Sequence, residues 1–185
     1  MKTVLIFGSP RPQGNTAAMA ERFCAALGGE TVQYNAYTAG IMPCIACDLC
    51  AREAKCVHAD RGADLLAALD AADVIVIASP VHFSDLPGPL VSMAGRLQYL
   101  WNRRFAGDTV LSVKPRRGVI LLSGGGSGKP DRALANARCY LHVLGAEITD
   151  EILSLKTDTL PASADANALA QIDAAAKKMK EIYHE

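Results

Sequence analysis

Three short apolar runs constrain this chain most, because each is rich in β-branched residues and each leads directly into a loop of small and polar residues. The runs cover residues 3–7, 72–78 and 118–122. Continuous apolar runs of this length are typical of strands that are buried on both faces of a parallel sheet. Ligands of such sheets bind beyond the carboxyl ends of the strands, so the three loops are expected to converge on one crevice.

Helical patterns alternate with these strands along the chain. Apolar residues recur at spacings of three and four after Thr16, from Pro87 to Leu100, and again near the C-terminus. Shorter patterns predict helices over 64–69 and 131–144 and two more strands over 31–37 and 147–155. Five strands and five helices predict an α/β fold, a doubly wound five-stranded parallel sheet with helices on both faces. Residues 1–185 show no internal repeat or linker, which predicts one domain.

The loop over residues 8–16, with the sequence GSPRPQGNT, is the first candidate binding site. It ends where a helix begins, and unpaired amides together with the helix dipole favour an anion there. Further donors are offered by Ser9, Arg11, Asn15 and Thr16. The loop has neither the G-x-G-x-x-G nor the G-K-[ST] pattern, so it suits the terminal phosphate of a mononucleotide. The alternative is a polar turn in which Asn15 or Thr16 only caps the helix.

These loops resemble those of a known family. The segments GSPR and GNT resemble the flavin phosphate loop of the NADPH-dependent FMN reductase family, within the flavodoxin-like superfamily, and SPVHF and SGGG resemble its loops at the flavin ring. The resemblance covers nearly the whole chain and implies the strand order 2-1-3-4-5 and bound FMN. The implied FMN-binding residues are Ser9, Arg11, Gly14, Asn15, Thr16, Pro80, Val81, His82, Phe83, Ser123, Gly124, Gly125 and Gly126.

The same resemblance implies a function. It is that of an NAD(P)H-dependent reductase of a flavin, quinone or similar small acceptor, working as a homodimer or homotetramer. We predict no catalytic side chain, because the flavin itself carries this chemistry. One departure is noted: where such reductases often have a lysine and then an Asp-Arg pair in their third helix, this chain keeps only Arg96.

Four of the six cysteines lie in one insertion, at about residues 43–60, as Cys44, Cys47, Cys50 and Cys56. Packing alone would scatter cysteines, and a cytosolic protein rarely holds structural disulfides. A C-x2-C-x2-C run with a fourth cysteine further on suits an iron–sulfur cluster, whereas zinc sites more often pair two C-x2-C units across a longer spacer. A [4Fe–4S] cluster therefore outranks zinc. Unligated thiols at the flavin mouth and a redox dithiol stay open as alternatives.

The cysteine spacing also resembles the compact motif of the iron–sulfur flavoproteins, a branch of the same superfamily in which a [4Fe–4S] cluster relays electrons to FMN. This implies an alternative function, a relay of single electrons from a ferredoxin-like donor through the cluster to FMN. A flavin-free binding module is the third alternative. For Cys24 and Cys139, which lie in helical patterns beside apolar neighbours, we expect burial as small hydrophobic side chains.

Composition excludes several other classes. The 185 residues carry a formal net charge of zero and are 50% hydrophobic, enough to bury a sizeable core but without the basic surplus of a nucleic-acid-binding protein. The first apolar run is too short for a signal peptide, and no segment approaches membrane-spanning length. We therefore expect a soluble cytoplasmic protein with no membrane or nucleic-acid partner.

Overall fold

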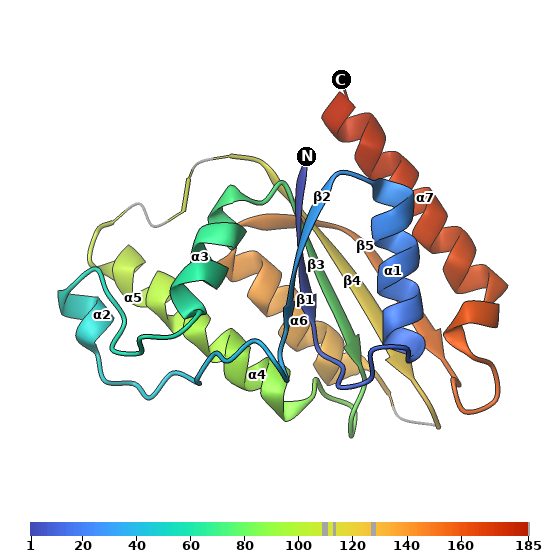
Figure 1. Cartoon of the computed structure of the whole chain (residues 1–185), viewed down its shortest axis with the longest axis horizontal. Coiled ribbons are helices and arrows are strands. Elements are labelled where there is room, and N and C mark those ends of the chain that lie inside the picture. The colour runs from blue at the N-terminus through green and yellow to red at the C-terminus, as the bar shows by residue number, and fades with distance from the viewer. Residues whose placement is uncertain (109–110, 113, 127–128, 185) are drawn as a thin grey trace.

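The computed structural model describes residues 1–108, 111–112, 114–126 and 129–184. Its centre is a five-stranded, all-parallel sheet with the strand order β2-β1-β3-β4-β5 (Figure 1). The strands are β1 (Lys2–Phe7), β2 (Glu30–Asn35), β3 (Val74–Pro80), β4 (Arg116–Gly124) and β5 (Ala146–Leu155). The predicted flavodoxin-like sheet and its strand order are thus confirmed.

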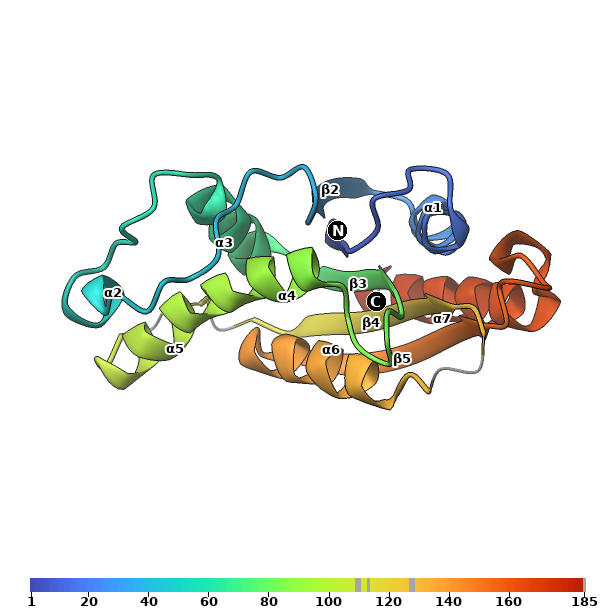
Figure 2. The same cartoon turned by 90° about the horizontal axis from the view of Figure 1, so that it is seen from below.

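Helices cover both faces of the sheet. On one face α1 (Asn15–Leu27) and α7 (Ala166–His184) run side by side (Figure 1). The other face carries α3 (Gly62–Ala71), α4 (Gly88–Ala94) and α6 (Asp131–Val143). Both views show α2 (Leu49–Arg52) and α5 (Gln98–Phe105) beyond α3 and α4, at the left of each picture (Figure 2).

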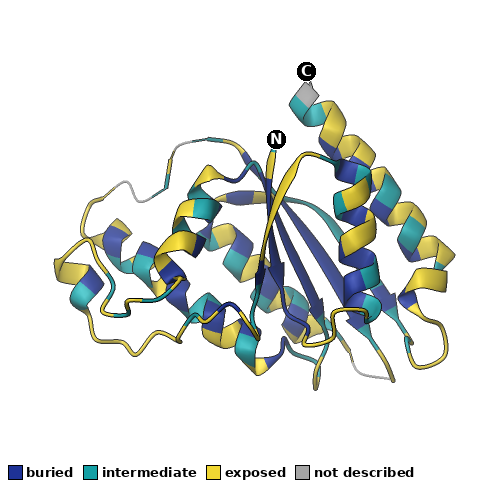
Figure 3. Cartoon of the chain, viewed as in Figure 1, coloured by how far each residue is buried: buried dark blue, intermediate teal, exposed yellow. Residues whose placement is uncertain are grey.

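The central strand β3 divides the core into two halves by simple alternation. Val74, Val76 and Ala78 pack toward α1 and α7, while Ile75 and Ile77 pack toward α3, α4 and α6. All five side chains are fully buried, and the strands form the dark centre of Figure 3. Since both faces of β3 are covered, the run has no polar position, which is why it reads as continuously apolar in the sequence.

Some element boundaries differ from the sequence-based expectation, and α3, expected over 64–69, spans Gly62–Ala71. The helix expected from Pro87 onward is divided by a 3-10 turn (Gly95–Leu97) into α4 and α5, although its apolar stripe, Leu90 to Leu100, is buried as expected. The second strand ends at Asn35, because the Asn35 Oδ1 atom accepts the Tyr37 N–H group at 2.8 Å and turns the chain. The four-residue helix α2 was not predicted.

The carboxyl ends of the parallel strands meet at the lower edge of the sheet in Figure 1. The loops after β1, β3 and β4 therefore lie together at that edge, as the rule for parallel sheets predicts. Among the described residues, no helix combines the length and the apolar character needed to span a bilayer.

Candidate functional site

A cleft with a volume of about 300 Å³ lies at this edge, between the loops that follow β1, β3, β4 and β5. All the predicted FMN-binding residues line it except Phe83 and Gly126. The Phe83 side chain instead projects into solvent, fully exposed. The lining residues are Ser9, Pro10, Arg11, Gly14, Asn15, Thr16, Pro80, Val81, His82, Ser123, Gly124, Gly125, Thr157 and Asp158.

Buried hydroxyl groups join the loops after β1 and β4. The Thr16 and Ser123 hydroxyl oxygens lie 2.7 Å apart, and both residues are buried. In this pair one O–H donates to the other, so the second O–H stays free to donate to a ligand. The buried Ser9 hydroxyl oxygen accepts the Arg11 N–H group at 3.2 Å, so its own proton is likewise available.

Asn15 is oriented by a contact from the far end of the chain. Its Oδ1 atom accepts the Ala162 N–H group at 2.9 Å. A backbone N–H can only donate, so the atom facing it must be the side-chain oxygen, and the Asn15 amide group is left to donate elsewhere. The loop therefore depends on the segment after β5 for its geometry.

The first turn of α1 is open for an anion. Its N-cap is Gly14, and within the described chain no side chain caps this helix. The capping interpretation of Asn15 and Thr16 is thus wrong: Asn15 bonds Ala162 and Thr16 bonds Ser123. The first N–H groups of an α-helix have no carbonyl partner within that helix, so those of α1 can donate to a ligand.

The tight turn after β3 places backbone along the cleft. The His82 N–H group donates to Asp85 O at 2.8 Å, and the Asp85 N–H group donates to His82 O at 2.9 Å. Between them Phe83 and Ser84 have φ values of 51° and 69°, in the left-handed region that costs a non-glycine residue free energy. Asn136 on α6 braces the turn by donating to the Asp85 carboxylate at 2.7 Å.

Thr157 and Asp158 were missed by the sequence analysis. The Thr157 N–H group donates to Gly124 O at 2.9 Å, and a Cβ atom on Gly125 would lie only 2.2 Å from the Asp158 carboxylate. Gly125 thus has no side chain because Asp158 occupies that space. The signal was present in the sequence: these residues follow β5, and its carboxyl end must lie at the same edge as the others.

The donor set of the cleft fits a phosphate monoester next to a flat ring. Hydroxyl groups, an amide, the first turn of α1 and Arg11 supply donors at one end. Backbone at Val81, His82, Gly124 and Gly125 supplies a narrow wall at the other.

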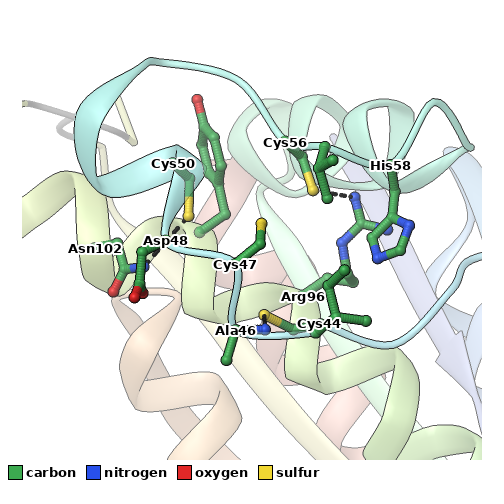
Figure 4. Close-up of a pocket in the computed structure, with 12 residues that line it drawn as sticks. Cys44, Ala46, Cys47, Asp48, Cys50, Cys56, His58, Arg96 and Asn102 are labelled. Carbon is green, nitrogen blue, oxygen red and sulfur yellow. Dashed lines mark hydrogen bonds between the residues drawn. The ribbon is translucent and has the colours of Figure 1, made fainter.

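The four clustered cysteines line a second, smaller pocket, outside the sheet (Figure 4). The chain wraps around this pocket because Ala46 and Asp48 have left-handed φ values of 51° and 56°. Three of the sulfurs accept hydrogen bonds: Ala46 N–H donates to Cys44 Sγ at 3.5 Å, Asn102 Nδ2 to Cys50 Sγ at 3.3 Å and Arg96 Nη2 to Cys56 Sγ at 3.1 Å. Such donors suit electron-rich thiolate sulfur.

A single metal ion does not fit this arrangement. In the part of the chain that the structure describes, no three His, Cys, Asp or Glu side chains are gathered closely enough to hold one ion. Zinc requires such tetrahedral convergence. A [4Fe–4S] cluster uses the same four thiolates spread around a larger body, and the shared pocket with its N–H donors has that donor set.

Two expectations about the cysteines are wrong. The cysteine pocket shares no lining residue with the cleft, so the thiols do not line the cleft of their own chain. For Cys139 burial was the wrong expectation, because this residue is exposed on α6. Cys24 is half-buried on α1 and packs against the core, where burial raises the pKa of its thiol. Amphipathic helices bury only part of their apolar stripe, and these two positions lie at its margin.

Comparisons with known proteins agree with this geometry. A family model described as NADPH-dependent FMN reductase matches residues 1–159. An iron-sulfur flavoprotein from Methanocaldococcus jannaschii is 32% identical over 99 residues, covering 52% of this chain and about half, 51%, of that protein. An iron-sulfur flavoprotein from Methanosarcina thermophila is 26% identical over 98% of this chain and 95% of its own length.

Among solved structures, an FMN-dependent NADH-azoreductase from Bacillus anthracis in complex with FMN superimposes with a TM-score of 0.69. The alignment covers 97% of this chain and 99% of that one, at 18% sequence identity. At this identity the likeness is one of fold.

Proposed function

Because this chain belongs to the NADPH-dependent FMN reductase family, we propose that it is an FMN-dependent oxidoreductase that passes electrons from NAD(P)H to a small acceptor such as a flavin or a quinone. One observation carries the proposal: the loops after β1, β3 and β4 meet in one cleft whose donors suit a phosphate at one end and a flat ring at the other.

When bound, FMN supplies the redox chemistry, in which a hydride is accepted and its two electrons are passed on. The chain supplies position. Ser9, Asn15, Thr16 and the first turn of α1 hold the phosphate, with Arg11 adding positive charge. Backbone of the loops after β3 and β4 would border the ring, where fixed dipoles stabilise negative charge that develops on reduction.

A test of this proposal follows the flavin absorbance of the purified protein after anaerobic mixing with NADPH or NADH. We expect a yellow protein whose flavin band bleaches with at least one of the two nucleotides. A flavin-loaded protein that stays oxidised with both would contradict the reductase. A colourless protein that does not take up added FMN would favour the flavin-free binding module.

The phosphate site is tested by the double variant Asn15→Leu, Thr16→Val. Hydrogen bonds to a charged group contribute about 1.5–3 kcal/mol each, so losing two should weaken FMN binding by roughly 100-fold or more. Thr38→Val, which changes an exposed threonine outside the cleft, is the control and should leave FMN binding unchanged. Stoichiometric FMN in the double variant would show that the phosphate lies elsewhere.

A relay with an iron–sulfur cluster is the second candidate function, because four cysteines share one pocket and three of their sulfurs accept N–H donors. Cys44, Cys47, Cys50 and Cys56 would hold the cluster, which supplies one-electron transfer when bound. A ferredoxin-like protein would then be the donor in place of a nicotinamide. Anaerobic purification followed by iron and sulfide analysis tests this: a brown protein with iron supports the relay, and an iron-free yellow protein favours the nicotinamide-dependent reductase.

For compartment and assembly we propose the cytosol and a homodimer or homotetramer. The six cysteines are free, as thiols are in a reducing compartment. The fully exposed Phe83, in the turn after β3, and the half-exposed Trp101 are apolar side chains that an interface would cover. Light scattering after gel filtration measures the assembly, and a monomer would contradict it.

A further inference from the structure

Cys56 is the cysteine whose position the local sequence explains least. Cys44, Cys47 and Cys50 follow one another at intervals of three, so one wrapped segment carries all of them to the pocket. Cys56 comes six residues after Cys50, beyond the end of α2 and an exposed loop. Something other than spacing must hold its sulfur at the same pocket.

Arg96, in the 3-10 turn between α4 and α5, makes that contact. Its Nη2 atom donates to Cys56 Sγ at 3.1 Å, and its side chain is 2% exposed. Its Nη1 atom donates to the two Asp60 carboxylate oxygens at 2.9 and 2.7 Å and to Met42 O at 3.2 Å. The guanidinium thus contacts residues at both ends of the cysteine insertion, Met42 and Asp60. Figure 4 shows it beside Cys56.

A buried guanidinium is costly unless it is paired. Here Asp60, whose side chain is 12% exposed, supplies the counter-charge. Burial alone would raise the pKa of Asp60, but hydrogen bonds from Arg96 and from the Met42 and Gly62 N–H groups, with the Arg96 charge, hold that pKa below its usual value. The ion pair is therefore stable as a charged unit, and its second nitrogen remains directed at sulfur.

Gly62 leaves room for this arrangement. A Cβ atom at Gly62 would lie 2.5 Å from Arg96 Nη2, the nitrogen that reaches Cys56. The backbone of α3 thus approaches the guanidinium as closely as it can. An added methyl group must displace the guanidinium, because an arginine side chain moves more easily than a helix backbone.

We propose that Arg96 is a positioning residue for the cysteine site, which fixes the Cys56 sulfur and raises the reduction potential of the centre that this sulfur ligates. The inference rests on the second candidate function, the [4Fe–4S] cluster. A hydrogen bond from a cationic donor to a ligating sulfur stabilises the more negative, reduced state, and such bonds are among the factors that set cluster potentials. Lysine cannot replace Arg96, because one ammonium group cannot span Asp60 and Cys56 as the planar fork does.

The experiment compares the wild-type protein with Arg96→Lys and Gly62→Ala after anaerobic reconstitution with ferrous iron and sulfide. Iron per chain, the electron paramagnetic resonance spectrum of the reduced protein and its midpoint potential are measured. We expect FMN to be retained, and the midpoint potentials of both variants to shift to more negative values with a changed spectrum. Loss of iron in a variant that keeps its FMN also supports the positioning role.

Arg61→Lys is the matched control. Arg61 is exposed, lies next to Gly62 and contacts Asp64 and the Tyr34 ring, so its variant should keep the wild-type potential. Iron-loaded Arg96→Lys and Gly62→Ala with wild-type potentials would overturn the role of Arg96 and leave the cluster standing. If Arg96→Lys fails to fold, Gly62→Ala decides, since it keeps the arginine. A wild-type protein that takes up no iron would overturn the cluster and this role together.

Discussion

At the scale of single residues, both sites depend on donors whose other contacts are already satisfied. Asn15 is fixed by Ala162 and Arg96 by Asp60, and each keeps N–H groups for a site. In the Thr16–Ser123 pair one of the two O–H groups remains to donate. Such groups lose little further side-chain entropy when they bind a ligand. The cleft lining also carries little net charge, because the positive charge of Arg11 is balanced by the negative charge of Asp158 and the other donors are neutral.

Asp73, at the amino end of β3, allows a prediction about pH. Its carboxylate accepts the Lys2 N–H group at 2.7 Å and Lys114 Nζ at 2.9 Å. Burial opposes ionisation, but these contacts and the nearby positive charges lower the pKa of Asp73 below its usual value. The folded-state pKa thus lies below the unfolded value of about 3.9, so the stabilisation is present above that pH and is lost as pH falls through the folded-state pKa.

We therefore expect Asp73→Asn to lower the free energy of unfolding at pH 7 by about 1 kcal/mol, and the difference to be smaller at a pH below the unfolded pKa of about 3.9. Urea unfolding at both pH values measures it. Asp64→Asn, at an exposed position 3.9 Å from Arg61, is the control and should change little. An undiminished difference at the lower pH would mean that the effect comes from packing rather than charge.

At the scale of elements, glycine positions set how closely helices approach the sheet. In β4, Gly118 lies where the pairing register with β5 shifts, and a Cβ atom there would be 2.8 Å from Leu141 Cδ1 on α6. Glycine therefore lets α6 lie directly on β4. The helix in turn holds Asn136, which braces the turn of His82 to Asp85 at the cleft.

Gly118→Ala tests this close approach. We expect a loss of about 1–3 kcal/mol in the free energy of unfolding, because the added methyl group overpacks a dense core. Gly88→Ala, at the start of α4 where a Cβ atom would meet nothing within 4 Å, should change it by less than about 0.5 kcal/mol. Chemical denaturation of both variants gives the comparison, and equal values would refute the packing argument.

At the scale of the whole molecule, the cleft joins distant parts of the chain. Its lining runs from Ser9 to Asp158, and Asn15 depends on Ala162. The cysteine pocket lies elsewhere, joined to the cleft by α4 and the 3-10 turn, a path of about 15 Å along residues 88–97. A ligand in the cleft would contact the loops after β1, β3, β4 and β5, while the cysteine insertion lies apart from them.

Binding of FMN should therefore stabilise the whole domain. At a free FMN concentration of 100 times Kd, binding adds about 2.7 kcal/mol to the free energy of unfolding. For a chain of this size that raises Tm by about 5–10 °C. Thermal unfolding with and without FMN measures this shift. Riboflavin, which lacks the phosphate, is the control and should give a clearly smaller shift. Equal shifts from both ligands would contradict a phosphate site at the first turn of α1.

The sequence alone was sufficient for the sheet and for most of the cleft. Runs buried on both faces, such as 74–78, have no polar positions, and parallel strands place their following loops at one edge, so local patterns predicted a parallel sheet with a cleft at that edge. The strand order came from the family resemblance of the loops and not from these patterns. It was insufficient for Phe83, which is adjacent to lining residues yet points outward because the turn at His82 and Asp85 reverses the chain.

Contacts between residues far apart in the chain were decided by the tertiary structure alone. The orientation of Asn15 by Ala162, the place of Asp158 over Gly125 and the reach of Arg96 to Cys56 leave no periodic trace in the sequence. Hydrophobic periodicity reports which side of an element is buried, whereas the direction of one polar side chain depends on partners that folding brings near. Local patterns therefore predicted the α/β class, and the resemblance of the loop motifs added the family and the strand order. The geometry of the two sites came from the tertiary structure alone.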